Sequence, residues 1–279
     1  MEALALPFFR TALVASLVLA GIHAYLGYHV VRRGVIFVDL ALAQMAALGL
    51  AVAVLLDLHE NVVWSYLLPF GMTVIGAACF AWLRNRARQV PLEAYIGIVF
   101  ATAQAAVFLL LEKSPSGPEH VKETLVGSIF TVAPSHVLKT AILYAAVGTL
   151  HVFLRKPFFE ITDDPEGART RGRNLFAWDF LFYATFGLVV TSAVKIAGVL
   201  LVFGLLVIPA AAGVLTTRSP GRALLVGWVF SFLAAGIGLL GSVHFDAPAA
   251  PSILVALSAL LVTLGAGTRV LDGLRARRA

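Results

Sequence analysis

The sequence is short of cysteine and of charge, and both shortages limit what the chain can be. Cys79 is the one cysteine among 279 residues, which excludes an intramolecular disulfide and a cysteine-ligated metal cluster. Charged residues make up 13% of the chain and hydrophobic residues 60%, against roughly 25% charged in ordinary soluble domains. The mean hydropathy of +0.92 points the same way. We therefore expect an all-α polytopic membrane protein whose helices form a compact bundle.

Catalytic and nucleotide-binding motifs are missing as well. The chain contains no GxxxxGK[ST] phosphate loop, no HExxH and no GxSxG, so we expect no enzyme and no permanently bound cofactor. A net charge of +6 could suggest nucleic acid as a partner. The basic residues, however, lie in short connections between apolar runs and not on one soluble face, so we expect the lipid bilayer and no nucleic acid.

Long apolar runs are what the sequence has in abundance. A helix needs about 20 apolar residues to cross a bilayer. With this length as the measure, the pattern predicts about nine spans, and the boundary near Lys195 could be drawn differently. The predicted spans lie near residues 11–31, 35–56, 62–83, 91–111, 135–154, 176–194, 197–216, 222–241 and 251–270.

The distribution of basic residues predicts the orientation, because short cytoplasmic loops are enriched in Lys and Arg. With the N-terminus outside, 16 of the 21 basic residues fall in inside loops and five fall outside. An odd number of spans keeps this alternation along the chain. We therefore predict a multi-pass protein with its N-terminus outside and its C-terminus in the cytoplasm.

Two connections within a single transmembrane domain of residues 1–279 are long enough to carry structure. In the outer one, apolar residues recur every four positions over residues 119–129, which predicts a short amphipathic helix. In the inner one, the sequence Thr-Asp-Asp-Pro-Glu at 162–166 is typical of a helix start, with acids and proline in the first turn. Residues 162–174 are predicted as a short basic helix or turn, with an ordinary solvated loop as the alternative.

Four residues with a carboxylate, amide or imidazole side chain lie within the first two predicted spans. The apolar stretch 34–49 carries Asp39 and Gln44, and the span before it carries His23 and His29. A charge at the centre of a membrane helix costs about 2.5–3.5 kcal/mol, so such groups usually face a bundle interior or a water-filled path. Imidazole and carboxylate together suit Zn²⁺, Mn²⁺ or Fe²⁺. We predict that these four residues belong to a metal path.

Each of these residues has a structural alternative. Asp39 can lie near the end of its span and be held by Arg32 or Arg33, and the two histidines can be hydrogen-bonded between helices or lie at a membrane boundary. Asp39 and Gln44 are five residues apart, about 140° around a helix. They therefore do not share one face, and a simple two-ligand site on this helix is not expected.

A further pair of candidates lies at the predicted outer mouth. His244 and Asp246 stand in the segment 241–248, between two predicted spans. They are predicted to contribute to the metal path where an ion would enter. The alternative is a turn followed by a helix N-cap.

Several stretches together resemble the permease subunits of zinc/manganese-type ABC importers, over nearly the whole chain. The segment KIAGVLLVFGLLVIPAA at 195–211 looks like that family's VGxLLxxxLLxxPAA, and DAPAAPS at 246–252 resembles its DxPxGPxI. Three shorter matches are EAYIGI at 93–98 for the acid-xxxGI start of a span, LVGS at 125–128 for an outer LxG helix, and PEGARTRG at 165–172 for a cytoplasmic E-xA-xxxG segment.

The resemblance implies the transmembrane subunit of an ATP-driven importer for divalent transition metal ions in a bacterial plasma (inner) membrane. Zinc is the first expectation for the transported ion, with manganese or iron as alternatives. The implied partners are a separate ABC ATPase, a periplasmic or extracellular metal-binding protein and a second permease copy in a homodimer. The ATPase is expected to dock on the cytoplasmic segment, through Asp164, Glu166, Ala168, Arg169 and Gly172.

The stretch 34–49 departs from the family's pattern. The family reads GDxLAHxxLxG there, and its Asp and His, four residues apart, are implicated in metal passage. Here Gln44 stands in the place of the histidine, Leu40 in that of the acid, and Asp39 one residue earlier. Glutamine is a weak, neutral ligand, so either the metal site is rearranged or the cargo differs.

Two other functions fit the composition. One is a related importer permease for siderophore or corrinoid cargo, although that type usually has more spans. The other is an intramembrane enzyme or assembly factor, for which the scattered Ser and His residues supply no recognisable nucleophile and base.

Overall fold

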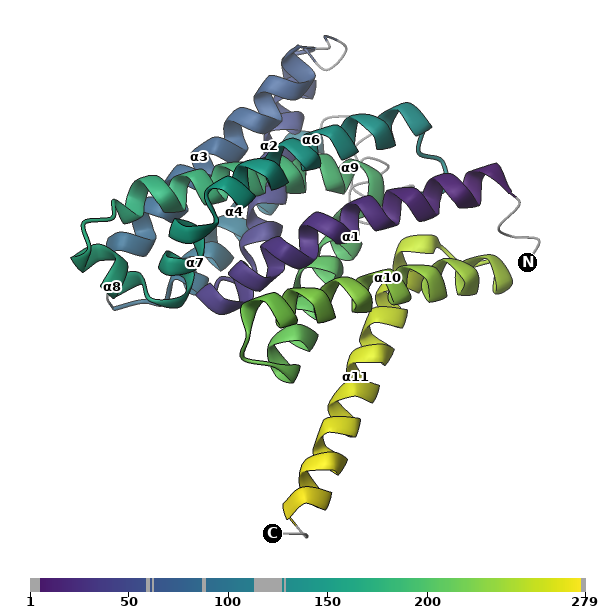
Figure 1. Ribbon diagram of the computed structural model, residues 1–279. Coiled ribbons are helices and arrows are strands. Elements are labelled where there is room, and N and C mark those ends of the chain that lie inside the picture. The colour runs from purple at the N-terminus through teal and green to yellow at the C-terminus, as the bar shows by residue number, and fades with distance from the viewer. Residues whose placement is uncertain are drawn as a thin grey trace. The chain divides into compact units, whose positions relative to one another are not determined.

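The protein is helical throughout the part that its structure describes. The computed structural model describes residues 6–58, 61, 63–86, 89–112, 127 and 129–276, with side chains up to residue 268. These residues contain helices and turns, which confirms the all-α prediction (Figure 1). The helices are α1 (Pro7–Arg33), α2 (Val38–Leu55), α3 (Trp64–Arg86), α4 (Leu92–Leu111), α6 (Pro134–Phe153), α7 (Arg155–Asp163), α8 (Pro165–Thr170), α9 (Leu175–Thr216), α10 (Pro220–His244) and α11 (Ala249–Ala276). Residues 119–126 of the predicted outer helix lie outside the described residues.

Eight of these helices are long and apolar enough to cross a membrane, where the sequence predicts about nine spans. They are α1, α2, α3, α4, α6, α9, α10 and α11. The difference lies in α9, whose 42 residues cover both of the spans predicted around Lys195. Its backbone leaves helical geometry at Gly198, so α9 consists of two helical segments that meet at a kink. The sequence prediction places the break about three residues too early.

The chain forms two compact units, which we describe separately. The first contains residues 1–31, 128–139 and 200–279, and the second contains residues 32–127 and 140–199. Each unit therefore combines segments that are distant in the sequence. Within α9 the chain passes from the second unit to the first between Val199 and Leu200, directly after the kink at Gly198.

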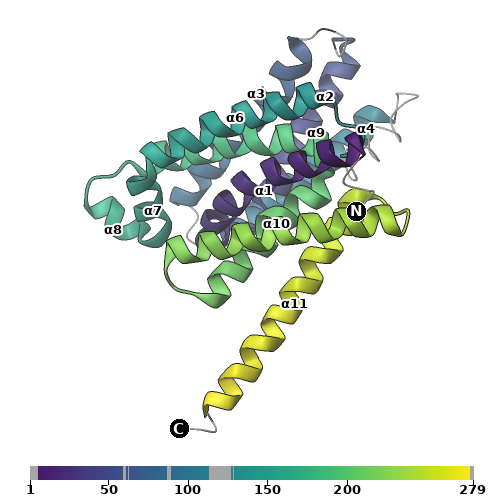
Figure 2. The same ribbon diagram turned by 45° about the vertical axis from the view of Figure 1, so that its right-hand side comes forward.

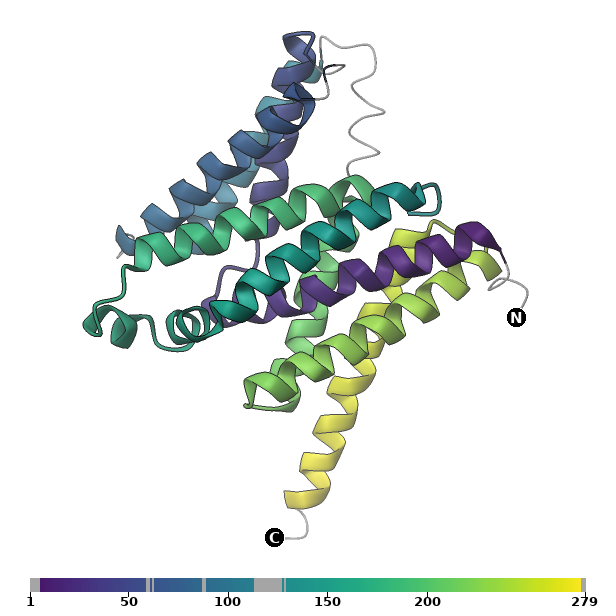
Figure 3. The same cartoon turned by 45° about the horizontal axis from the view of Figure 1, so that its top comes forward.

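In the second unit, α3 and α4 pack against α2 (Figure 3). Gly49 of α2 lies against the backbone of Leu68 and Pro69, where a Cβ atom would be 2.5 Å from a carbonyl oxygen. At the far end of α2, Ala51 packs with Val107 and Leu111 of α4. Because α2 is covered on most sides, it carries almost no amphipathic pattern, as expected of a helix inside a membrane bundle.

In the first unit, α11 begins beside the end of α10 and then runs away from it (Figure 1). A Cβ atom added to Gly238 of α10 would lie 2.4 Å from the Cα of Ile253 in α11. The two helices therefore touch there without an intervening side chain. Trp228 of α10 donates a hydrogen bond from Nε1 to the backbone oxygen of Gly21, at 2.8 Å. These contacts fix α10 between α1 and α11.

The kink of α9 lies at Gly198, and a second glycine, Gly127, makes a close contact with it. Gly198 has φ 73° and ψ 161°, a conformation that is essentially restricted to glycine. Gly127, with φ 68°, lies against it, and a Cβ atom on Gly127 would be 2.3 Å from the backbone nitrogen of Gly198. The kink is therefore held by a backbone-to-backbone contact that any larger residue would push apart.

We predict that Gly127→Ala lowers the thermal stability of the purified protein. The added methyl group meets rigid backbone at 2.3 Å, and the positive φ costs an L-residue about a further 1 kcal/mol. Differential scanning fluorimetry in detergent would measure the shift in Tm. Gly71→Ala in α3 is the matched control, because nothing lies within 4 Å of its added Cβ. Equal Tm values for the two variants would contradict the account of the kink.

Candidate functional site

Asp39 lies in the first turn of α2, in the second unit. The chain leaves α1 at Arg33, turns at Gly34 with φ 67°, and re-enters helical geometry at Val38. This short connection places Asp39 inside the protein, where its exposed fraction is 1%. Its Oδ1 atom is buried and receives no hydrogen bond from the described residues. A buried carboxylate oxygen without a donor is costly, and it marks a place where a cation could bind.

Glu93, in the first turn of α4, supplies a second carboxylate at the same place. Its Oε1 accepts a hydrogen bond from the backbone N–H of Phe37, the residue before α2, at 3.0 Å. Its Oε2 is buried and has no hydrogen-bond partner among the described residues. Through its bond to Phe37, Glu93 is held two residues before Asp39 in the chain, at the entry to α2. The start of α2 therefore holds two carboxylates, each with one unsatisfied oxygen.

The set of predicted metal-path residues does not include Glu93. The sequence signal for it is the acid-xxxGI pattern, which places an acid at the start of α4. Its closeness to Asp39 depends on the packing of α4 against α2, 54 residues away in the chain, and is not visible in the sequence.

Gln44 lies one and a half turns further along α2 and is also buried, with an exposed fraction of 6%. Asp39 and Gln44 are on different faces of the helix, as predicted, and both are buried because α2 is covered on most sides. The structural alternative for Asp39 named Arg32 and Arg33 as partners. Their guanidinium groups pair with other carboxylates, Arg32 with Asp163 and Arg33 with Asp179, each at 3.0 Å.

His23 and His29 lie on α1, in the first unit, and both are completely buried. The Nδ1 atom of His23 is 2.7 Å from the backbone oxygen of Leu19, one turn earlier in the same helix. The ring of His29 meets the edges of Tyr25 and Tyr28, with centroids 4.9 and 5.7 Å away. The alternative for His23 was a hydrogen bond between helices; the bond to Leu19 lies within α1.

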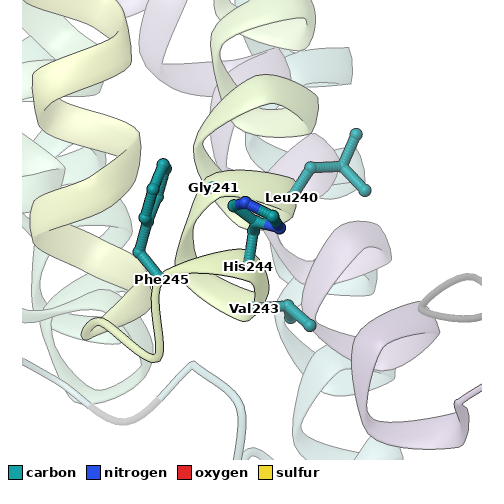
Figure 4. Close-up of a pocket in the computed structure, with 5 residues that line it drawn as sticks. All are labelled: Leu240, Gly241, Val243, His244 and Phe245. Carbon is teal, nitrogen blue, oxygen red and sulfur yellow. The ribbon is translucent and has the colours of Figure 1, made fainter.

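His244 is the last residue of α10 and Asp246 lies in the turn between α10 and α11, and both are exposed. His244 lines an open depression of about 450 Å³ together with Leu240, Gly241, Val243 and Phe245 (Figure 4). Among these lining residues only His244 can ligate a metal. Asp246 has φ 50° and precedes α11 by three residues, so it occupies the turn and is not the N-cap of that helix.

The described residues bring together no group of three or more His, Cys, Asp or Glu side chains that could hold a metal ion. A resident metal site of the usual kind is therefore not seen in this part of the chain. The two carboxylates at the start of α2 form a weaker constellation. It fits an ion that passes through better than one that stays.

The segment 162–174, predicted to be cytoplasmic and to dock an ATPase, contains the end of α7 and all of α8, two short helices between α6 and α9 (Figure 2). The predicted helix start is confirmed: Asp164 caps α8 by accepting a hydrogen bond from the N–H of Gly167 at 2.9 Å, and Pro165 occupies the first helical position. Gly172, with φ 81°, follows the end of α8. The helix α7 was not predicted, because its nine residues mix basic, aromatic and acidic side chains in a short run.

Ala168 joins α8 to the rest of the second unit. Its exposed fraction is 0%, and it packs with Ile161 of α7, Leu175 of α9 and the partly buried Trp178. Glu166 and Arg169, by contrast, present side chains that are 78% and 47% exposed and lie 3.6 Å apart. One face of α8 is therefore anchored, and the other is available to a partner.

Ion pairs hold the end of this segment. Glu160 of α7 binds Arg171, and its other oxygen accepts from Arg173 at 3.2 Å. The hydrogen bond from Arg171 lowers the pKa of Glu160 below its usual value. A lowered pKa means that these pairs are fully formed above the usual pKa of glutamate and are lost only as the pH falls through the lowered value.

Known proteins resemble this chain over almost all of its length. Residues 5–266 match the family model of the ABC 3 transport family. A probable iron transport system membrane protein of Haemophilus influenzae is 26% identical, and the match covers 94% of each chain. The high-affinity zinc uptake system membrane protein ZnuB of the same organism is 25% identical, with 90% of this chain and 94% of that protein covered.

A solved structure has the same fold. PsaBC from Streptococcus pneumoniae in complex with Fab superimposes with a TM-score of 0.78 and 20% identity, covering 94% of this chain and 93% of that one. The match to the family model, which includes the segments at 93–98, 165–172, 195–211 and 246–252, confirms the resemblance read from the sequence and makes the chain a transport component and not an enzyme. The protein belongs to the ABC 3 transport family, as a multi-pass permease of a metal ABC importer.

Proposed function

We propose that this permease imports a divalent first-row transition metal ion, with zinc as the first ion to test and manganese and iron as the alternatives. The observation that carries the proposal is the pair of carboxylates of Asp39, which is buried, and Glu93, which is half-buried, each with a buried, unsatisfied oxygen within membrane-spanning helices. Oxygen ligands favour divalent cations, and the absence of sulfur ligands beyond Cys79 and three methionines disfavours copper.

Asp39 and Glu93 would offer the ion a transient site at the start of α2. A cation between two carboxylates removes their mutual repulsion, while only two protein ligands leave the site weak enough to release the ion. Gln44 would follow as a neutral ligand along α2. His23 and His29 in the first unit, and His244 and Asp246 at the α10–α11 turn, remain proposed contributors to the same path.

The permease would work as a homodimer with a separate ATPase and an extracytoplasmic metal-binding protein. Its N-terminus would lie outside, since the basic residues cluster in every second connection. Exposure of the polar path would alternate between the two sides as ATP binds and is hydrolysed. The exposed face of α8, with Glu166 and Arg169, would contact the ATPase.

Metal content and uptake of radiolabelled metal in a deletion strain test the transported ion. We expect a deficit in one of zinc, manganese or iron that is restored by the wild-type gene. A strain with normal content and uptake of all three ions would overturn the proposal. A deficit in siderophore or corrinoid uptake alone would favour the related type of importer permease.

Charge reversal at the exposed face of α8 tests the docking surface. We predict that Glu166→Arg or Arg169→Glu lowers ATP-dependent uptake about tenfold or more with unchanged amounts of permease in the membrane. The physical reason is that like charges facing each other across an interface cost several kcal/mol. Lys156→Glu in α7, whose side chain is exposed, is a charge-reversal control nearby. Normal uptake in both α8 variants would remove the docking assignment.

A further inference from the structure

A buried cluster of charges lies in the second unit, between the membrane-spanning helices and the α7–α8 segment. Asp179 of α9 is 1% exposed, and its Oδ1 accepts from Arg33 at 3.0 Å and from Arg84 at 2.5 Å. The side chain of Arg33 is 0% exposed and that of Arg84 is 16% exposed. We refer to these three residues as the Arg33–Asp179–Arg84 cluster. It ties the end of α1, the end of α3 and the start of α9 to one carboxylate oxygen.

The cluster is also bonded to α7. Nε of Arg33 donates to the hydroxyl oxygen of Thr162 at 2.9 Å, and that hydroxyl donates to the backbone oxygen of Phe158 at 2.7 Å. Next to it, Arg32 pairs with Asp163, the last residue of α7, at 3.0 Å. The guanidinium of Arg33 lies 4.1 Å from the centre of the Phe182 ring. Movement of α7 along its axis would therefore displace Arg33.

A second route reaches the cluster from α8. Arg169 donates to Oδ1 of Asn85 at 3.3 Å, and Asn85, which follows Arg84 in α3, donates to the backbone oxygen of Ala81 at 2.8 Å. Helix α8 therefore binds Asn85, and Asp179 binds Arg84, which are adjacent residues at the end of α3. Together, the two routes enclose α7, α8, α3 and α9 in one network of hydrogen bonds.

The electrostatics of the cluster resist partial disruption. Two guanidinium groups share one carboxylate oxygen away from water. Withdrawal of one arginine is costly, because it leaves a buried charge that neither water nor its former partner compensates. Such a cluster moves as a unit or rearranges as a whole, which is the property required of an element that passes on a displacement. An exposed ion pair, by contrast, contributes little and can break without consequence.

We propose that Arg84 and Asp179 are positioning residues that pass the displacement of α7–α8 to α3 and α9, and so couple ATP hydrolysis to metal movement. This inference rests on the proposed function, because it requires α8 to be the surface that the ATPase moves. Neither residue needs to touch the metal. α3 packs on α2, the helix that carries Asp39, so the cluster acts on the metal path through that packing.

The test is the number of metal ions transported per ATP hydrolysed, measured in proteoliposomes that contain the permease with its ATPase and binding protein, with whichever of zinc, manganese and iron the wild type imports. For Arg84→Gln, which leaves the Arg33–Asp179 pair intact, we expect this ratio to fall at least fivefold while ATP hydrolysis persists. The control is Arg86→Gln, two residues further along α3, whose guanidinium lies over the Trp82 ring and outside the cluster. Its ratio should equal that of the wild type.

Arg84→Lys provides a second variant that keeps the charge but loses the planar guanidinium. We expect an intermediate ratio for it. An unchanged ratio of ions transported to ATP hydrolysed in both Arg84 variants would overturn the inference. This includes the case in which less protein is folded, because uptake and hydrolysis then fall in the same proportion and the ratio stays the same. Failure of the proposed function looks different, because the wild-type complex itself would then show no ATP-dependent uptake of zinc, manganese or iron.

Discussion

Asp39→Asn is expected to reduce metal uptake about tenfold or more, corresponding to at least ~1.4 kcal/mol of lost stabilisation for the passing ion. The substitution keeps the size and shape of the side chain and removes its charge. Because Asp39 is buried and its Oδ1 has no partner among the described residues, loss of the charge should not unfold the helix. Uptake of radiolabelled zinc at matched amounts of membrane protein is the measurement.

Two further variants make this result specific. Asp57→Asn alters an exposed carboxylate just beyond the other end of α2 and should leave uptake unchanged. Glu93→Gln should lower uptake to a similar degree as Asp39→Asn, because its amide oxygen can still accept from the N–H of Phe37 while the second charge is lost. Normal uptake in Asp39→Asn would contradict the role of α2 as part of the metal path.

Ala168→Leu is expected to abolish ATP-dependent uptake and to reduce co-purification of the ATPase. Ala168 is fully buried against Ile161, Leu175 and Trp178, and added methylene groups in a filled core cost about 1–3 kcal/mol. The strain can be relieved only by moving α8 away from α7 and α9, which displaces the exposed face with Glu166 and Arg169. Pull-down of the ATPase by tagged permease measures the loss.

The matched control is Ala177→Leu, in the first turns of α9, because Ala177 is exposed and the larger side chain meets no packed neighbours. It should bind the ATPase and support uptake like the wild type. Equal ATPase binding by Ala168→Leu and Ala177→Leu would show that the packing of α8 does not determine docking.

The sequence predicts best what depends on local composition. Apolar runs of sufficient length predict the membrane helices, because the bilayer demands both length and apolarity. The start of α8 was also predictable, since Asp164 and Pro165 determine a helix start by themselves. The kink at Gly198 was placed near Lys195 instead, because a glycine within an apolar run gives no sign of its φ and ψ.

Features that depend on contacts between distant segments could not be predicted. Glu93 comes near the start of α2 only through the packing of α4 on α2, and Arg84 meets Asp179 only through the packing of α3 and α9. The sequence does not indicate which of these distant residues pair. Tertiary packing therefore brings together residues that the sequence presents only one at a time.

The most direct test of the central claim is ATP-dependent accumulation of metal by proteoliposomes that contain the permease and its ATPase, supplied with the metal-binding protein outside. Zinc, manganese and iron would each be offered in radiolabelled form, with Asp39→Asn as the reference for background. We predict that one of these ions accumulates in the wild-type vesicles only when ATP is present, and that Asp39→Asn reduces this accumulation about tenfold. Absence of ATP-dependent accumulation for all three ions would contradict the account.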